Sequence, residues 1–242
     1  MHELIINNKR IDDWAIVSQV EYSPFSIVNL YKERADNYPS FYGTSRTNKL
    51  IKISLILKNQ CQDYLNLQED LENKILTEIK SDSPSWIELD NRYFYGILED
   101  VEISKMYQGS ATITLNNIYG KWFSKKITKK LGDSFYLKGV EETDVAIINL
   151  IPTTTNPKIH YKDKSISIEN ALVQRNISIN LSDKTVKQLG DHLAINIDSD
   201  FFNLELGSNI IVTENASGSI EYREVLSLWF IFIIGMKYKL IA

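Results

Sequence analysis

Apolar and polar residues alternate along much of this chain, and the alternation predicts β-strands separated by short polar turns. Residues 50–57 alternate at first and are then apolar throughout, which is typical of a central strand. Residues 111–115 place Ala, Ile and Leu on one face and threonines on the other, so one face is expected to be buried. Residues 4–6 and 15–20 predict two further strands on either side of a turn.

One segment has the period of a helix instead. Its apolar residues recur every three or four positions and so share one helical face: Tyr64, Leu67, Leu71, Ile75 and Ile79. Asn59 is a suitable N-cap, with Gln62 three residues later as in a capping box. Pro84 cannot continue a helix, so the spacing predicts one helix over residues 61–80.

A hairpin is predicted directly after this helix. Its strands are residues 86–89 and 93–98, and its turn is at Asp90 and Asn91. Asp and Asn tolerate the left-handed backbone that tight hairpin turns need.

The second half of the chain shows short strands only. They are predicted at residues 147–151, 159–161, 165–169, 176–181 and 193–197, separated by polar turns. A closing β-hairpin is predicted from strands at 209–213 and 219–225, with residues 214–218 as its turn. Short strands at regular spacing favour a β-sandwich.

Residues 22–42 have few periodic apolar positions, two prolines and many aromatics, so we expect a long arm or loop. The arm suits three roles: core packing, a protein interface, which favours aromatics, or stacking on sugar rings. As an interface between subunits, the candidate residues are Tyr22, Phe25, Tyr31, Tyr38, Phe41, Tyr42 and Arg46.

The composition indicates a globular chain. It has 242 residues, of which 43% are hydrophobic and 24% charged, so disorder is not expected. The net charge of −4 does not support a general nucleic-acid-binding surface. Cys61 is the one cysteine, so no intrachain disulfide can form, and the N-terminus has no signal-peptide pattern.

Candidate chemistry is sparse. His2, His160 and His192 lack the spacing of metal ligands, and no nucleophile or phosphate-binding motif is present. Adjacent carboxylates such as Glu99 and Asp100 point to opposite faces of a strand, so they are not expected to share a site. The sequence therefore predicts no catalytic, cofactor or metal residues and no enzyme.

Two segments depart from the average composition. Residues 121–130 carry five lysines, which suits a solvated linker or strand face, or an electrostatic contact with a partner. Residues 225–236 are almost wholly apolar but shorter than the ~20 residues of a membrane-spanning helix. The alternatives for this tail are a buried or partner-contacting strand, a disordered appendage, or a membrane contact.

The order of these elements resembles the distal tail protein (Dit) family of siphophages. The resemblance lies in residues 4–20 with the following arm, in residues 91–123 with their aromatic strand, glycine turn and alternating strand, and in residues 201–225. It implies a mainly β fold with one helix. Residues 1–123 would be a split-barrel-like, ring-forming domain, and residues 124–242 a galectin-like β-sandwich with an atypical apolar extension over 226–242.

The same resemblance implies a function. The protein would form a hexameric ring hub that joins the tail tube to the tail-tip apparatus and lets DNA pass. Expected partners are the major tail protein and tail-associated spike, lysin and receptor-binding proteins, without specific nucleic-acid recognition or membrane insertion. The expected location is the virion tail tip, after synthesis in the bacterial cytoplasm. Alternatives are a carbohydrate-binding module, expected to expose aromatics on one sandwich face, or another tail-tube component.

Overall fold

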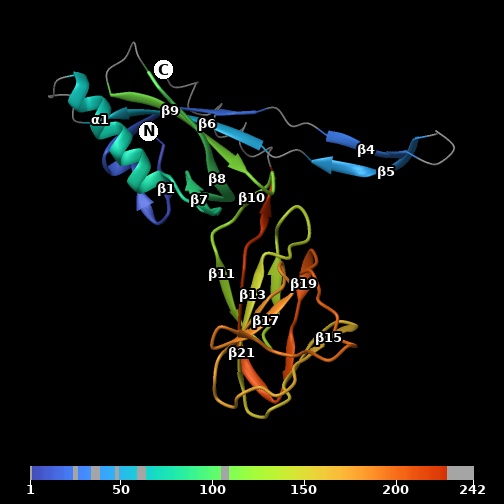
Figure 1. The fold of residues 1–242 in the computed structure, drawn as a ribbon. Helices are drawn as coiled ribbons and strands as arrows, with labels where there is room; N and C mark the ends of the chain where they lie inside the picture. The colour runs from blue at the N-terminus through green and yellow to red at the C-terminus, as the bar shows by residue number, and fades with distance from the viewer. Residues whose placement is uncertain are drawn as a thin grey trace. The chain divides into compact units, whose positions relative to one another are not determined.

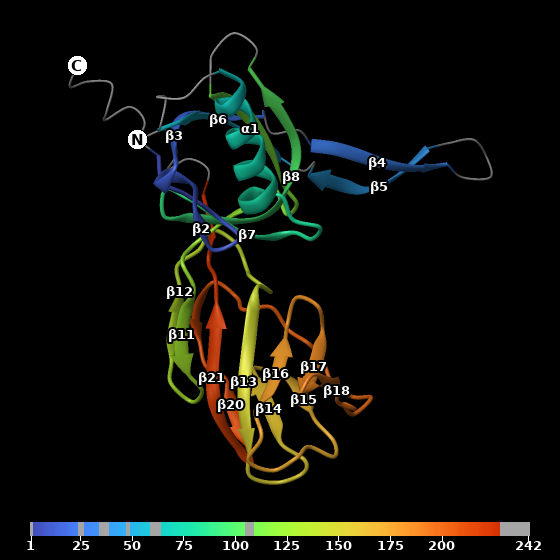
Figure 2. The ribbon, with the colours of Figure 1, turned by 60° about the vertical axis from the view of Figure 1, so that its left-hand side comes forward.

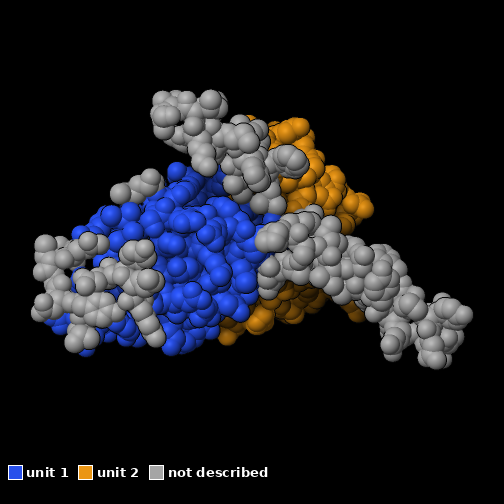
Figure 3. Space-filling view, turned by 90° about the horizontal axis from the view of Figure 1, so that it is seen from above, with its two compact units in different colours: residues 1–122 blue, residues 123–242 orange. Residues whose placement is uncertain are grey.

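The computed structural model describes residues 2–23, 27–33, 39–46, 49–58, 64–104 and 109–227, with backbone alone for 27–33, 39–46 and 64–65. The chain divides into two compact units, Met1–Trp122 and Phe123–Ala242, which are coloured separately in Figure 3. β10 (Trp122–Phe123) spans the boundary. The prediction of a mainly β fold with one helix is confirmed.

Unit 1 is built on an antiparallel sheet whose strands follow the order β2-β1-β7-β8-β9-β6-β3 (Figure 1). Its strands are β1 (Leu4–Ile6), β2 (Lys9–Arg10), β3 (Ala15–Tyr22), β6 (Lys49–Leu57), β7 (Ser85–Leu89), β8 (Arg92–Ile103) and β9 (Ser110–Asn117). A short 3-10 turn, η1 (Ile11–Asp13), lies between β2 and β3. The predicted central strand is β6, which pairs with β3 and β9.

The predicted helix is present and covers one face of the sheet (Figure 2). It consists of α1 (Tyr64–Lys74) and a π-helical turn, η2 (Ile75–Ile79). Its buried face is the predicted one, with Leu67, Leu71, Ile75 and Ile79 all at most 3% exposed. The side-chain amide of Asn7 donates to the carbonyl oxygen of Ile79 over 3.1 Å, which pairs one carbonyl left open where the helix ends. The proposed cap at Asn59 lies outside the described residues.

The predicted hairpin at Asp90 and Asn91 is also confirmed. β7 and β8 pair directly, and the two turn residues have φ of 52° and 62°. Positive φ at both central residues defines the tight turn whose twist matches its strands.

Of the two alternatives for residues 22–42, an arm or a loop, the loop is wrong over much of the segment. β4 (Ile27–Glu33) and β5 (Pro39–Arg46) form an antiparallel hairpin. These two strands pair with each other and with no other described strand.

Unit 2 contains three sheets (Figure 2). The first has the order β11-β21-β13-β16-β17-β18, the second β15-β14-β20 and the third β12-β19. Their bounds are β11 (Ile127–Lys130), β12 (Phe135–Leu137), β13 (Ala146–Pro152), β14 (Lys158–Tyr161), β15 (Lys164–Ser167), β16 (Ile177–Asn180), β17 (Thr185–Gln188), β18 (Asp191–His192), β19 (Gly207–Asn209), β20 (Val212–Glu214) and β21 (Ala216–Tyr222); β22 (Val225–Leu226) follows.

The core of unit 2 is shared by all three sheets, which confirms the predicted sandwich. Ile148 and Ile220 enter it from the six-stranded sheet, Ile159 and Ile166 from the three-stranded sheet, and Leu137 from the third. Alternate residues of β13 and β16 are buried, as expected for strands with one face in the core.

Two local predictions in unit 2 are wrong. Residues 193–197 form no strand and contribute a single bridge, Ile195 to Ile168, while β17 was missed. The closing β-hairpin is absent, because β20 pairs with β14 and β21 pairs with β13. The chain therefore crosses from one sheet to another at Asn215, whose φ is 58°.

Candidate functional site

The sheet of unit 1 has one apolar face and one polar face. In β6, Ile51, Ile53, Leu55 and Leu57 are buried on the apolar face, and the residues between them point the other way. Directly paired residues share a face, so the register identifies the other members of the polar face. They form two rows that run across β3, β6, β9 and β8 in that order. The first row is Glu21, Lys52, Thr114 and Asp100, and the second row is Gln19, Ser54, Thr112 and Glu102.

A bulge adds a further carboxylate to this face. The register of β8 shifts between Leu98 and Asp100, so Glu99 is the extra residue. The Asn116 side-chain amide donates to Glu99 Oε2 over 2.9 Å, which holds this carboxylate beside the polar rows. The expectation that Glu99 and Asp100 point to opposite faces is therefore wrong, because it assumed a regular strand.

The polar face is acidic, and we call it the acidic face. Its four carboxylates, Glu21, Glu99, Asp100 and Glu102, are all exposed, and Lys52 is the one cation in the two rows. Four negative charges against one positive charge give a local excess that the whole-chain charge of −4 does not reveal.

Two strand edges border this face. β3 ends the strand order on one side. On the other side β7 pairs with β8 only from Arg92 to Gly96, so β7 does not cover the edge of β8 from Ile97 to Ile103. β10 also pairs with β8, whereas β3 has one partner, β6, among the described strands. The edge of a strand without a partner carries unpaired N–H and C=O groups that can pair with another strand.

The predicted interface residues of the arm fall into three groups. Tyr31, Phe41, Tyr42 and Arg46 lie on the β4–β5 hairpin, where Tyr31 and Phe41 are register partners and Ile27 pairs with Arg46. Tyr42 lies at a register shift of this hairpin. Phe25 and Tyr38 lie outside the described residues. Whether these residues contact another subunit stays a prediction.

Tyr22 precedes the arm at the end of β3 and is 42% exposed. Its ring meets Trp122 edge-on, with centroids 5.9 Å apart. Burial, with a smaller contribution from Asp90, raises the pKa of its phenol. The Ser23 N–H donates to the Leu50 carbonyl oxygen over 2.9 Å, so the chain leaves the sheet toward the arm from a fixed point.

The residues considered for chemistry are dispersed. His2 contacts Asp90 and His160 contacts Glu214, at 2.6 and 2.8 Å, in different units. Among the described residues, no group of three His, Cys, Asp or Glu side chains is placed to hold a metal ion. No helix within the described ranges is long and apolar enough to cross a membrane. Cys61 and the tail from residue 228 lie outside those ranges.

The predicted lysine run ends in an edge strand of unit 2. Lys129 and Lys130 are exposed on β11, and Lys126 pairs with Glu221 over 2.8 Å. Lysines on an edge strand discourage unwanted strand pairing. This placement fits the solvated strand face, one of the two alternatives.

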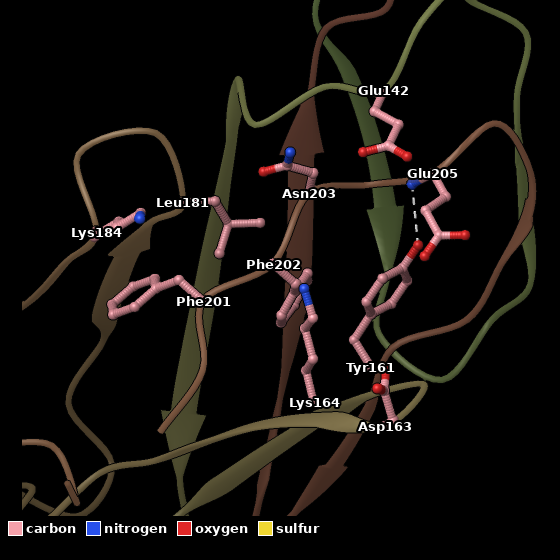
Figure 4. A pocket seen from close by; sticks show the side chains of 10 residues that line it. All are labelled: Glu142, Tyr161, Asp163, Lys164, Leu181, Lys184, Phe201, Phe202, Asn203 and Glu205. Carbon is pink, nitrogen blue, oxygen red and sulfur yellow. Dashed lines mark hydrogen bonds between the residues drawn. The ribbon is translucent and has the colours of Figure 1, made fainter. Parts of the chain in front are cut away.

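Most aromatics of the sandwich belong to its core. Phe135, Tyr161, Phe202 and Tyr222 are buried, whereas Tyr136 is 63% exposed. Phe201 is half-buried beside a pocket of about 140 Å³, shown in Figure 4. The cluster of exposed aromatics expected for a carbohydrate-binding module does not form from these six residues.

The Figure 4 pocket has a firmly held wall. The rings of Tyr161 and Phe202 stack with centroids 4.5 Å apart. The backbone N–H of Glu205 donates to the Tyr161 hydroxyl over 3.0 Å, and burial raises the pKa of this phenol. The pocket is formed by residues from separate strands and turns, so no local sequence motif indicated it.

No protein-family model and no curated protein matches this chain. Among solved structures, the chain resembles the crystal structure of the SPP1 Dit protein (gp 19.1), described as a paradigm of the hub adsorption apparatus in phages that infect Gram-positive bacteria. The TM-score is 0.70 at 15% identity, covering 94% of this chain and 100% of that one.

A second likeness is to the baseplate of phage P2 in its activated conformation with Ca, with a TM-score of 0.58 at 13% identity. It covers 93% of this chain and 98% of the other. The fold is therefore of the class found in phage hub and baseplate proteins. More particularly, it is Dit-like across both units, so the resemblance found in the sequence is confirmed for the fold.

Proposed function

We propose that this chain is the structural distal tail protein of a phage or prophage tail, a ring-shaped hub between the tail tube and the tail-tip apparatus. The observation that carries the proposal is the fold likeness to SPP1 Dit, which extends over 94% of this chain and the whole of that protein. A likeness confined to one unit would support a shared module only.

The edge of β3 and the part of β8 that β7 does not pair with are the two strands that we propose for the ring contact. β3 and the Ile97–Ile103 part of β8 lie on opposite sides of the same four strands, β8-β9-β6-β3. If β3 of one copy pairs with β8 of the next, each copy uses two different surfaces for the contact. Repeating such a contact closes a ring when the rotation between neighbouring copies divides a full turn evenly. The β4–β5 hairpin, with its Tyr31, Phe41 and Tyr42, is proposed as a second contact between copies.

The acidic face supports passage of DNA. α1 covers the other face of the sheet, so the acidic face is the one available to line a channel (Figure 2). Glu21, Glu99, Asp100 and Glu102 would repel the phosphate backbone, to which nucleic-acid-binding proteins present lysine and arginine. A channel lined by these carboxylates would not hold DNA by its phosphates.

The remaining roles follow from the ring. The proposed partners are the major tail protein on one side and spike, lysin and receptor-binding proteins on the other. The proposed location is the virion tail tip, and the proposed role is structural, without catalysis.

The test is the solution mass of the purified full chain, measured by light scattering, together with negative-stain images. We expect six copies in one particle and rings with a central hole. A strictly monomeric protein at high concentration, with no rings in the images, would refute the proposed hub.

A further inference from the structure

An exposed line of apolar side chains in unit 2 carries an inference that goes beyond the proposed hub and does not depend on the ring. Around β19 every second residue is exposed, and the apolar ones are Leu206 and Ile210, each 49% exposed, and Val212, 46% exposed. Asn209 and Ile211 lie between them and are buried. Because neighbours in an extended chain point to opposite sides, the exposed residues share the outer face.

β12 adds an aromatic ring to this face. Tyr136 is the register partner of Ser208 and is 63% exposed, so its ring lies on the outer face as well. Leu206 and Ile210 stand two residues to either side of Ser208, which makes them diagonal neighbours of the ring. We call Tyr136, Leu206, Ile210 and Val212 the apolar stripe. Exposed apolar residues that adjoin in this way, unlike single ones, mark a surface that another segment covers.

The tail that begins at residue 228 has the matching chemistry. Its first seven residues are Leu, Trp, Phe, Ile, Phe, Ile and Ile, and residues 228–242 include no acidic residue. An apolar run of this kind left in water favours aggregation, so it requires an apolar surface to cover it. The apolar stripe is such a surface, and it belongs to the same unit.

The tail starts close to one end of the stripe. The N–H of Val140 donates to the carbonyl oxygen of Val225 over 3.0 Å, so the chain before the tail lies beside the segment that follows β12. Leu137 of β12 pairs with Gly207, which makes the Leu206 end of the stripe the end nearer to that segment. The tail therefore begins on the side from which the stripe runs toward Val212.

The length of the tail fits the stripe. From Leu206 to Glu214 the chain makes eight residue steps, or about 26 Å in an extended strand. Residues 228–237 cover at most about 33 Å when extended. The tail is thus long enough to run along the whole stripe and to bring its Lys237 to Glu214.

Charge complementarity supports the same direction. Glu214 continues the alternation of exposed residues beyond the stripe. Its Oε1 lies 2.8 Å from Nε2 of His160, and its side chain is 60% exposed, so the carboxylate can accept a further hydrogen bond. Lys237 and Lys239 are the two cations of the tail, and both follow the apolar run. A tail that runs toward Glu214 places its cations beside this carboxylate.

We propose that residues 228–239 lie along the apolar stripe of their own chain, with the apolar run against Tyr136 and Ile210 and the lysines at Glu214. This placement removes two apolar surfaces from water at once, which is favourable in proportion to the area covered. The extension that departs from the Dit pattern is then an intramolecular cover of the sandwich and not a contact for another protein.

The test uses photo-crosslinking of the purified full chain. Tyr136→p-benzoylphenylalanine places a photoreactive ring on the stripe, and mass spectrometry identifies the crosslinked peptides. We expect crosslinks to residues 228–239 in a product with the mass of one chain. The same substitution at Leu189, which is 70% exposed and directly follows β17, is the matched control and should give no crosslink to the tail.

Ile210→Asp tests the contact by a second measurement. A carboxylate within the stripe should release the tail, and trypsin should then cut after Lys237 roughly 10-fold faster, because cleavage follows the population in which the tail is free. Leu189→Asp adds the same charge at an exposed position outside the stripe and should leave the rate unchanged. Both positions are exposed, so neither substitution disturbs the core.

Three results would overturn the proposal: no tail peptide among the crosslinks from position 136, a tail crosslink found only in products with the mass of two chains, or equal trypsin rates for Ile210→Asp and Leu189→Asp. The second result would mean that the tail covers the stripe of another copy. Solution mass measured before irradiation separates this test from the hub, since rings without the intramolecular crosslink would refute only the tail contact.

Discussion

The hydroxyl of Tyr161 donates a hydrogen bond to Oδ1 of Asn209 over 2.5 Å, and both residues are 2% exposed. The two residues are 48 positions apart and belong to β14 and β19, so the bond links two sheets of unit 2. The Asn209 amide nitrogen is also paired, with the carbonyl oxygens of Glu205 and Gly207 at 2.9 Å. This buried polar network is therefore fully satisfied.

Tyr161→Phe should destabilise unit 2 by about 1–3 kcal/mol, since it leaves a buried acceptor and a backbone N–H without their partner. Urea unfolding followed by fluorescence measures the change. Tyr136→Phe is the matched control, because this tyrosine is 63% exposed, and its effect should stay within about 0.5 kcal/mol. Equal effects of the two substitutions would show that the Tyr161–Asn209 bond contributes nothing.

Stability should fall at alkaline pH. Burial raises the pKa of Tyr161 and of Tyr222 above the ordinary value of 10.0. Because the unfolded phenols ionise first, the contribution to stability is fully present below about pH 10 and is lost as pH rises further. Urea unfolding at a series of pH values should show this loss, and Tyr222→Phe should make it shallower. A free energy of unfolding that stays constant as the pH rises above about 10 would contradict this prediction.

The closing segment shows where sequence patterns reach their limit. Residues 209–225 contain two extended runs with polar residues between them, and a hairpin is the usual result of that pattern. The strands exist, but β20 pairs with Lys158–His160 and β21 pairs with residues 146–152. Pairing partners are chosen by the packing of the whole sandwich, which local alternation does not encode.

Asn215→Ala tests the sheet crossing. Asn215 has φ of 58°, and a left-handed backbone costs an ordinary residue about 1–2 kcal/mol. Asn215→Ala should therefore destabilise unit 2 by roughly 1 kcal/mol, and Asn215→Gly should restore most of the loss. Asn203→Ala, at an exposed position without positive φ, is the control. Urea midpoints that do not separate Asn215→Ala from this control would rule out a backbone constraint at residue 215.

In unit 1, two features follow from short stretches of sequence alone. The helix and the Asp90–Asn91 turn depend on spacing and on two residue types, and both were predicted. Over residues 22–42, Pro24, Pro39 and clustered aromatics obscure any strand period, so the sequence predicts an arm or loop and does not predict the β4–β5 hairpin. The acidic face was missed because its carboxylates come from β3 and β8, which are brought together by β6 and β9 between them, and because Glu99 lies on a bulge.

Tyr31 and Phe41 are register partners on the hairpin. Replacing both by Ala removes two aromatic side chains from the proposed interface and should therefore weaken the ring. Light scattering should show a shift from hexamer toward smaller species at equal concentration. Tyr136→Ala removes an exposed aromatic from unit 2 and should leave the mass unchanged. A hexamer unaffected by the double substitution would exclude the hairpin as an interface while leaving the ring itself possible.

The acidic face should keep duplex DNA from binding, and reversing its charge should make the protein bind. Asp100→Lys with Glu102→Lys replaces two exposed carboxylates on this face by ammonium groups. Glu69→Lys with Glu72→Lys makes the same change in net charge on exposed positions of α1 and is the matched control. Fluorescence anisotropy with a labelled duplex should detect binding for the first variant only, and its affinity should fall steeply with salt because phosphate contacts release counterions. If both variants bind equally, net charge and not the acidic face decides the behaviour, and the proposed channel lining loses its physical basis.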